Sequence, residues 1–544
     1  MNAPEKSPTP STTQPPANAT DAQAEPTGGS TNRREFLQLG AVSLLGASAL
    51  SNLPRANASH APTLGTAAPA LGRASSRVQV GDPLPNGMAT SIEAVFEQVK
   101  RKGTKEDLYR FLYALPKAGD IHHHLGGGIL PDVMYEVATD KKRNGGQRFF
   151  TRYRVDTSAG RLPFIPDYTS QLTQWLTIDE STYNTLPSDQ QAQFKAMEDL
   201  SNDERAAWEM SIVLDKNGEQ VHEFFEYHWP RLGALLTSID VMSEALLDNM
   251  VQFGKEKLRY IELQDGFANW RDAKGEVLPP EVANTIWKQK LRSPAARATG
   301  VEVRFQVIVL RFAEDALQRV EDAFAWLDRE RDLWVGINMA GREDNNDGHP
   351  RRFTDTYDRM LRKYPGIGIS IHAGESQKYD SHIFDTLRLG SHRIGHGINL
   401  FRDETTFQMM RGGPHLIEIN LVSNHLLGYV PDVMTHPFPL YLRQGIPCCL
   451  NTDDRGMWSS NMTDEYYSAV AYHNVSWKEL DQMARLSLTE SFAPPEVKAE
   501  LLAGYEADLR TFTDRVMSRG WKTVCDATDA TTYLYGERFF DLKL

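Results

Sequence analysis

The chain contains, at the end of an apolar run, the stretch Asp120-Ile121-His122-His123-His124-Leu125-Gly126-Gly127-Gly128. Side chains in a strand alternate between two faces, so His122 and His124 are predicted to point one way and His123 the other. Two imidazoles on one face, followed by glycines that leave space, suit a divalent metal ion. A histidine triplet can also lie in a solvated loop, so other motifs in the chain are needed to distinguish a metal site from a loop.

Seven further short apolar runs follow this one. The eight runs span residues 118–122, 258–263, 301–310, 333–338, 366–371, 393–396, 416–421 and 446–450. Most are almost continuously apolar, which is typical of strands covered on both faces. After the first run they start roughly 25 to 45 residues apart, the length of one βα unit. The pattern predicts an α/β fold, a (β/α)8 TIM barrel, with a doubly wound parallel sheet as the alternative.

Two segments depart from this simple repeat. The gap between the first two runs is far longer than one helix needs, and its polar segment 140–220 is predicted to be an inserted lobe. Before the first run, residues 91–115 are predicted to form an N-terminal helical extension. The barrel unit then spans 116–544, with closing helices over 463–519.

The N-terminal region indicates export. Residues 1–58 combine a disordered n-region with features of a twin-arginine signal peptide. The arginine pair 33–34 precedes the mildly apolar stretch 37–53, and residues 56–58 form a small-residue cleavage site. An amphipathic helix or a chance arginine pair is the alternative. Residues 59–90 are interpreted as a linker, and we expect a periplasmic or secreted protein.

Composition excludes several classes of protein. The chain has 544 residues, of which 40% are hydrophobic, so a sizeable core can form. Its formal net charge of −13 argues against a protein that binds nucleic acid. Three cysteines cannot make a disulfide framework. No apolar run is long enough to span a bilayer, so we expect no stable membrane anchoring.

Three more strand ends carry side chains suited to catalysis. The fifth run ends at His372, and Glu375 follows where a carboxylic acid can transfer protons in the same cavity. The sixth run ends at His396, which lies between glycines and suits a base beside a metal-bound water. The eighth run ends at Asp453-Asp454, paired carboxylates that need a cation or hydrogen bonds to compensate their repulsion.

The carboxyl ends of barrel strands converge on one mouth, so these side chains are predicted to share a site. The predicted ligands of one metal ion per chain are His122, His124, His372 and Asp453, with water completing the coordination. Nitrogen and oxygen ligands without thiolate fit zinc best, and iron, manganese or cobalt are alternatives. A bound zinc ion would lower the pKa of the water from 15.7 toward about 7.

These motifs resemble the adenosine deaminase family of amidohydrolase-type barrels. Further matching segments are Pro116-Lys117-Ala118, Ala340-Gly341-Arg342-Glu343, Ser423-Asn424, His436-Pro437-Phe438-Pro439, Thr463-Asp464-Glu465-Tyr466 and Ser491-Phe492. The resemblance covers residues 110–515 apart from the insertion. The leading helix and the early insertion are similar to those of the secreted, growth-factor-type adenosine deaminases, and the N-terminal helices are then candidates for a homodimer contact.

The resemblance implies hydrolytic deamination of adenosine, and of 2′-deoxyadenosine, to inosine and ammonia. By this resemblance, Glu375 is expected to protonate purine N1 as hydroxide attacks C6. His396 would take the proton from the zinc-bound water or orient that water. Asp454 would orient the nucleophile and accept a hydrogen bond from the purine, and Gly341 would offer a backbone donor to the base.

One departure from the family pattern leaves the substrate open. Gly126 stands where the family usually has an Asp that holds the ribose 5′-hydroxyl. Adenosine, deoxyadenosine, a 5′-modified nucleoside and a nucleotide all remain candidates for the small-molecule partner. Arg455 replaces a common Pro, and we expect it to pair with a carboxylate rather than a phosphate.

Two rival functions follow from the same residues. One is a metal hydrolase of this fold that acts on another aminopurine or on a cyclic amide. The other is a non-catalytic, nucleoside-binding signalling protein. Intact Glu375, His396 and Asp454 argue against the second, because a decayed site would have lost some of them.

Overall fold

The computed structural model describes residues 91–165, 169–343, 348–376 and 378–544 of the chain. The predicted signal peptide (1–58) lies outside the described residues, and so does the predicted linker (59–90). None of the helices in the described ranges is both long and apolar enough to cross a bilayer.

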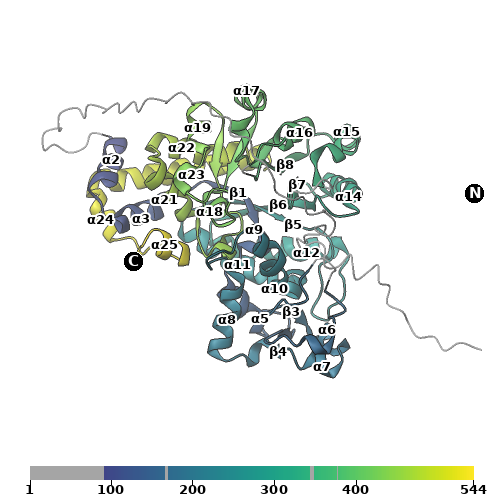
Figure 1. Cartoon of the computed structure of the whole chain (residues 1–544). Helices are drawn as coiled ribbons and strands as arrows, with labels where there is room; N and C mark the ends of the chain where they lie inside the picture. Colours follow the sequence, from purple (N-terminus) through teal and green to yellow (C-terminus); the bar gives the residue numbers. More distant parts are fainter. Residues whose placement is uncertain (1–90, 166–168, 344–347, 377) are drawn as a thin grey trace, which may run out of the picture.

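Eight parallel strands form one sheet whose order follows the chain (Figure 1). They are β1 (Gly119–His124), β5 (Tyr260–Asp265), β6 (Glu302–Leu310), β7 (Trp334–Ala340), β8 (Gly368–Ala373), β9 (Arg393–His396), β10 (Leu416–Ile419) and β11 (Cys448–Leu450). The first and last strands also meet, because Asp453 N–H donates to the His122 carbonyl at 3.0 Å and His124 N–H donates to the Asp453 carbonyl at 3.2 Å. The predicted (β/α)8 barrel is confirmed.

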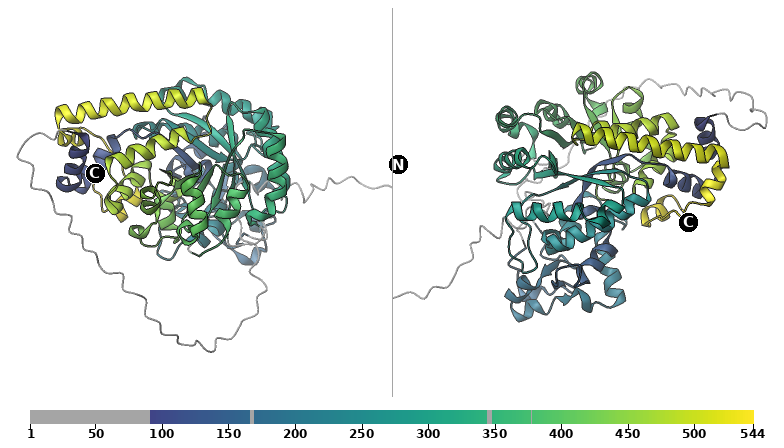
Figure 2. Two further views of the ribbon diagram at one scale, coloured as in Figure 1. Left: turned by 90° about the horizontal axis from the view of Figure 1, so that it is seen from above. Right: turned by 180° about the vertical axis from the view of Figure 1, so that it is seen from behind.

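Helices between successive strands cover the outside of the sheet, as the view from above in Figure 2 shows. They include α11 (Ile239–Lys255), α12 (Pro280–Leu291), α14 (Ala316–Arg329), α15 (Thr354–Lys363), α16 (His382–Arg388), α17 (Glu404–Gly412) and α19 (Phe438–Arg443). In α14, residues at helical spacing are buried, among them Val320, Phe324 and Leu327. That apolar stripe faces β6 and β7, which explains why an amphipathic sequence forms a barrel helix here.

Helices before and after the barrel pack on one another. They are α2 (Ile92–Lys102), α3 (Lys105–Ala114), α21 (Met462–His473), α22 (Trp477–Thr489), α23 (Pro495–Arg519) and α24 (Trp521–Asp526). The Phe96 ring lies 5.8 Å from Trp477, and the Phe111 ring lies 5.2 Å from Phe512. The N-terminal helices therefore bury their apolar faces against the C-terminal helices of the same chain.

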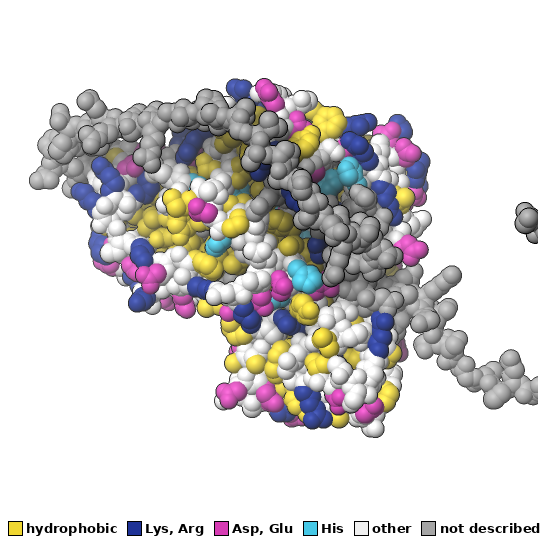
Figure 3. Space-filling view, in the orientation of Figure 1, with side chains coloured by type: hydrophobic (Ala, Val, Ile, Leu, Met, Phe, Trp, Pro, Cys, Tyr) yellow, Lys and Arg dark blue, Asp and Glu magenta, His cyan; other side chains and the backbone are white. Residues whose placement is uncertain are grey.

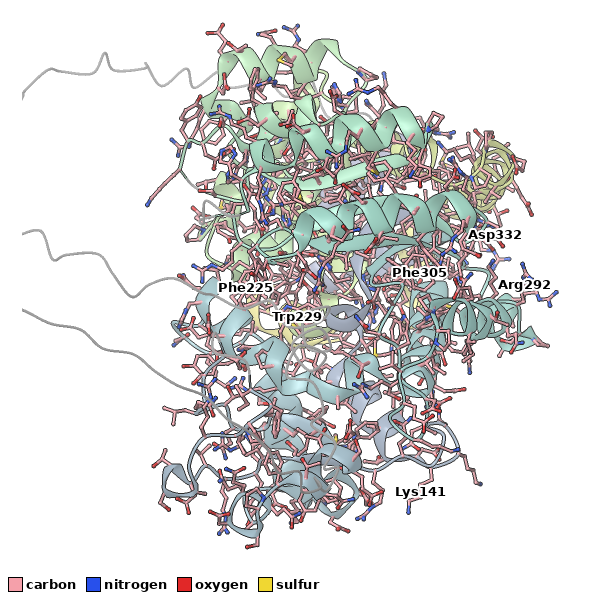
Figure 4. All side chains as sticks on the ribbon, turned by 90° about the vertical axis from the view of Figure 1, so that its right-hand side faces the viewer. Lys141, Phe225, Trp229, Arg292, Phe305 and Asp332 are labelled. Atoms are coloured by element: carbon pink, nitrogen blue, oxygen red, sulfur yellow. The ribbon has the colours of Figure 1, made fainter. Side chains whose placement is uncertain are left out.

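The segment between β1 and β5 contains a lobe that projects from the barrel (Figures 1 and 3). Its antiparallel sheet comprises β2 (Phe149–Thr151), β3 (Thr177–Asp179) and β4 (Lys195–Ala196), with β2 in the middle. The lobe has a small apolar core of its own, formed by Phe150, Leu162, Ile165, Leu176, Ile178, Leu186, Phe194 and Ala196. Phe225 and Trp229 lie where the lobe meets the barrel (Figure 4).

Candidate metal and active site

Four side chains from three strand ends converge in the barrel mouth. His122 and His124 come from β1, His372 from β8, and Asp453 from the turn after β11. All four are buried, and one ligand atom from each lies within 4.8 Å of the others. The sequence predicted these four residues as metal ligands, and the fold brings them together.

The second nitrogen of two of these rings is held by a buried partner. His122 Nδ1 lies 2.8 Å from the Glu418 carboxylate, and His372 Nδ1 lies 2.9 Å from Asn338 Oδ1. Both partners accept, so each Nδ1 carries the proton and each Nε2 presents a lone pair to the centre of the cluster. Such second partners orient metal-ligating imidazoles and raise their basicity.

The centre of the cluster has the donor set of a cation site. His124 Nε2 faces His372 Nε2 at 3.3 Å and Asp453 Oδ1 at 3.2 Å. Within the part of the chain that the structure describes, the buried atoms His122 Nε2 and Asp453 Oδ1 make no hydrogen bond. Buried polar atoms without a partner are costly, and a divalent ion would satisfy these atoms together. The residues present therefore fit the predicted metal.

His123 points away from the cluster, as the strand alternation predicts. Its Nδ1 lies 2.9 Å from Thr452 Oγ1, and its Nε2 lies 3.1 Å from the side-chain nitrogen of Asn249 on α11. The middle histidine of the triplet therefore ties the barrel to an outer helix.

Glu375 lies beside the cluster after β8. Burial first, and then the negative charge of Asp453, raise the pKa of this carboxyl well above its usual value. Its backbone N–H and that of Gly374 donate to the Glu343 carboxylate at 3.2 and 3.0 Å, and His382 holds Glu343 at 2.7 Å. The raised pKa favours the protonated carboxylic acid, which is the state that an acid catalyst requires.

His396 and Asp453 have unusual backbone geometry. Their φ angles are 65° and 55°, in the left-handed region that non-glycine residues rarely occupy. His396 Nε2 lies 3.7 Å from Glu375 Oε1, and its ring lies 5.0 Å from that of His122. Burial lowers the pKa of His396 to about 3, so its ring is neutral. Such strain is typical of functional sites, where the surrounding structure enforces it.

The pKa values of the adjacent carboxylates Asp453 and Asp454 are shifted in opposite directions. Burial acts to raise both pKa values, but interactions with His122 and His124 hold the pKa of Asp453 well below its usual range. Burial and the charge of Asp453 raise the pKa of Asp454 well above its usual value. The lowered pKa of Asp453 favours the ionised form that a metal ligand requires.

The remaining predicted residues, Gly126 and Gly341, are buried and follow the carboxyl ends of β1 and β7. Gly341 follows β7 with a φ of 103°, a conformation that favours glycine. A side chain at Gly126 would meet Leu236 Cδ2 at 2.7 Å and Trp229 Cζ3 at 3.0 Å. An apolar wall therefore occupies the space that a carboxylate at Gly126 would need.

Arg455 turns away from the cluster after Asp454. Its Nη1 lies 3.6 Å from Glu256 Oε1, and its guanidinium lies 4.5 Å from the centre of the Phe253 ring. The expectation that it pairs with a carboxylate is confirmed.

Sequence reasoning gave no role to several residues that shape the site. Glu418 and Asn338, which hold ligand histidines, lie within otherwise apolar strands. A charged or amide side chain inside a buried strand is itself a signal, because it needs a partner there. Gly127, Asn424 and His436 were visible only as parts of motifs.

Fold and site together place the protein among the metal-dependent hydrolases built on a (β/α)8 barrel. The chain belongs to the adenosine deaminase family, since the family profile described as adenosine deaminase matches residues 194–507.

Curated relatives are distant. The adenosine deaminase of Aedes albopictus is 24% identical over 420 residues, which are 74% of this chain and 74% of the relative. The adenine deaminase of Chelativorans sp. (strain BNC1) is 30% identical over 210 residues, 38% of this chain and 63% of the relative.

Solved structures share the fold at low identity. The Arabidopsis N6-mAMP deaminase has a TM-score of 0.53 and 21% identity, covering 73% of this chain and 99% of its own. An amidohydrolase from Burkholderia ambifaria with bound Zn has a TM-score of 0.53 and 17% identity, covering 75% of this chain and 94% of its own.

Proposed function

We propose that the protein hydrolyses adenosine, and 2′-deoxyadenosine, to inosine and ammonia, with one zinc ion per chain. The observation that carries this proposal is the cluster of three imidazoles and Asp453, with Glu375 and His396 beside it. Membership of the adenosine deaminase family supports a purine as the substrate. Zinc is supported by the nitrogen and oxygen donor set and by the Zn in the Burkholderia structure.

The residues divide the reaction between them. When bound, zinc would lower the pKa of a coordinated water and so supply a nucleophile at neutral pH. Glu375 gives its proton to ring N1, which makes C6 more electrophilic. Asp454 orients the water toward C6, and Gly341 contributes a backbone donor to the base.

The chemistry balances with water as the only second substrate. Its oxygen forms a bond to C6, and the C6–N bond then breaks. One proton of the water restores Glu375, and the other leaves with the amino group as ammonia. Protonation converts a poor leaving group into a neutral molecule, which is the contribution of acid–base catalysis here.

A second candidate is another aminopurine, free or as a nucleotide. The apolar wall of Leu236 and Trp229 at Gly126 favours a substrate whose sugar end differs from that of adenosine. Two proteins similar to this chain are named for such substrates: the adenine deaminase of Chelativorans and the Arabidopsis N6-mAMP deaminase.

The decisive experiment is a substrate panel followed by ultraviolet absorbance, with and without chelator. We expect adenosine and deoxyadenosine to be converted, and conversion to stop when the metal is removed. Turnover of adenine or AMP with adenosine unchanged would establish the second candidate. Tight metal binding with no turnover of any nucleoside would instead support a signalling protein.

Export through the twin-arginine pathway and a homodimer contact through α2 and α3 stay predictions. Fractionation of cells that express the full chain tests the first, and light scattering of the purified protein tests the second.

A further inference from the structure

A line of buried hydrogen bonds leads from His396 away from the site. His396 Nδ1 lies 2.9 Å from the side-chain nitrogen of Asn424, and Asn424 Oδ1 lies 2.9 Å from His436 Nε2. The line ends at the backbone of Phe438, whose N–H donates to His436 Nδ1 at 3.2 Å. Asn424 and His436 are buried.

The donor and the acceptor of each of these hydrogen bonds follow from the one that the Phe438 N–H makes. A backbone N–H can only donate, so His436 Nδ1 accepts from Phe438 and carries no proton. Burial first, and the neighbouring His473, lower the pKa of His436 to about 3, so the ring is neutral and its proton lies on Nε2. That N–H donates to Asn424 Oδ1, which leaves the Asn424 amide nitrogen to donate to His396.

We propose that Asn424 and His436 are positioning residues that fix His396 as the neutral imidazole with its proton on Nε2. His396 Nδ1 is then an acceptor within the protein, and Nε2–H faces the site as a donor. The amide nitrogen of Asn420, 3.2 Å from the same Nδ1, adds a second donor. The Phe438 backbone N–H therefore determines, through His436 and Asn424, which ring nitrogen of His396 carries the proton.

This assignment separates the two roles that the sequence left open for His396. With a proton already on Nε2, the ring has no lone pair there to take a proton from water. It orients the nucleophile by donating to its oxygen, and the proton passes to a carboxylate instead. This consequence for turnover rests on the proposed function, whereas the proton position does not.

Two substitutions alter the line in opposite ways. Both are made in the Asn420→Ala background, which removes the second donor to His396 Nδ1. Asn424→Asp then replaces the remaining donating amide with a group that accepts on both sides, so the favoured form of His396 carries its proton on Nδ1. His436→Gln has an oxygen that accepts from Phe438 N–H and an amide that donates to Asn424. It therefore keeps the direction of the line while changing the ring, and serves as the matched control.

The test is nitrogen NMR of the zinc-loaded full chain with ¹⁵N-labelled histidine, the His396 signals being those lost in His396→Gln. We expect an unprotonated Nδ1 and a protonated Nε2 in the wild type and in His436→Gln. The pattern should reverse in Asn424→Asp. A protonated Nδ1 in the wild type would overturn the proposal, as would an unchanged pattern in Asn424→Asp.

Two further measurements cover other outcomes. If Asn424→Asp does not fold, His436→Leu replaces it in the test. Without the His436 partner, the side-chain amide of Asn424 can rotate and present either its oxygen or its nitrogen to His396. We therefore expect both tautomers of His396 in His436→Leu. A single Nε2–H tautomer in His436→Leu would contradict the relay. With adenosine, Asn424→Asp should lower kcat with little change in KM, and the control His436→Gln should lower kcat much less. Wild-type protein with the expected tautomer but no turnover would contradict only the proposed function.

Discussion

The carboxylate of Asp454 lies directly against the α-carbon of Gly127. A β-carbon at Gly127 would lie 1.9 Å from Asp454 Oδ1 and 2.6 Å from its Cγ. These distances are shorter than any real contact, so only glycine leaves Asp454 where it is. The helical turn after β1 and the strand end after β11 therefore determine together where the proposed water-orienting carboxylate points.

Replacing this glycine should therefore act on chemistry rather than on metal binding. In Gly127→Ala, the methyl group displaces the Asp454 carboxylate, and we expect turnover to fall by roughly 100-fold, as for a misplaced reacting group. Zinc content should stay near one per chain, because Asp453 is not touched. Gly412→Ala is the control, since nothing lies within 4 Å of a β-carbon there. Equal activity in both variants would remove Asp454 from the mechanism.

Glu375→Gln tests the proposed acid. The amide keeps the size of the side chain but has no acidic proton, so turnover should fall by about 100-fold to 10,000-fold. Metal content and the thermal unfolding curve should match the wild type. Normal activity in this variant would mean that another group protonates the purine.

Asp453→Ala tests the ligand assignment. Loss of the only carboxylate in the proposed ligand set should lower the zinc content measured by elemental analysis. Asp454→Asn serves as the control, because that side chain is outside the set and should leave zinc content unchanged. An unaltered stoichiometry in Asp453→Ala would show that the ligands are others.

Asn338→Leu tests the partner of a ligand. Leucine has nearly the same shape but no acceptor for His372 Nδ1–H, so the ring loses its fixed orientation. Loss of such a partner typically weakens metal binding about 10-fold to 100-fold. Asn338→Asp retains an acceptor and should bind zinc more tightly than Asn338→Leu in a competition with a chelator. The reverse order would contradict the orientation given to His372.

Asp464 should make stability depend on pH. Burial raises its pKa from an ordinary 3.8 to about 8, against hydrogen bonding from Tyr109. Between these values the folded state holds a proton that the unfolded chain has lost, so stability falls as pH rises through this window. Asp464→Asn cannot titrate, and its apparent Tm should therefore fall less than that of the wild type between about pH 5 and pH 8. Parallel Tm curves for the two proteins would show that Asp464 does not titrate in this range.

Much of the fold could be predicted from the sequence, because barrel strands are buried on both faces and therefore appear as continuous apolar runs. All eight predicted runs overlap a strand of the sheet, although β1, β5, β6, β7, β8 and β11 begin one or two residues after the apolar run does. Hydrophobicity extends into the turn before pairing starts, so it cannot mark the first hydrogen-bonded residue. The small sheet of the lobe has strands of only two or three residues, too short for a periodic signal.

The ligand residues were predictable because strand alternation and the common mouth of a barrel are local and topological rules. The partners of those ligands were not predictable. The contact between Glu418 and His122 joins strands far apart in the chain. The contact between Asn338 and His372 joins successive strands, but hydrophobicity does not show which side chains of two paired strands meet.

The amino-acid sequence by itself determined which residue types end each strand, and therefore which side chains could meet in the mouth. Only the tertiary structure decided their protonation states and orientations. The charge and the proton position of a side chain depend on its burial and on groups several hydrogen bonds away. The hydrogen bonds from the Phe438 backbone to His396 are an example. Such neighbours are supplied by the fold, which packs the segment between β10 and β11 against the end of β9.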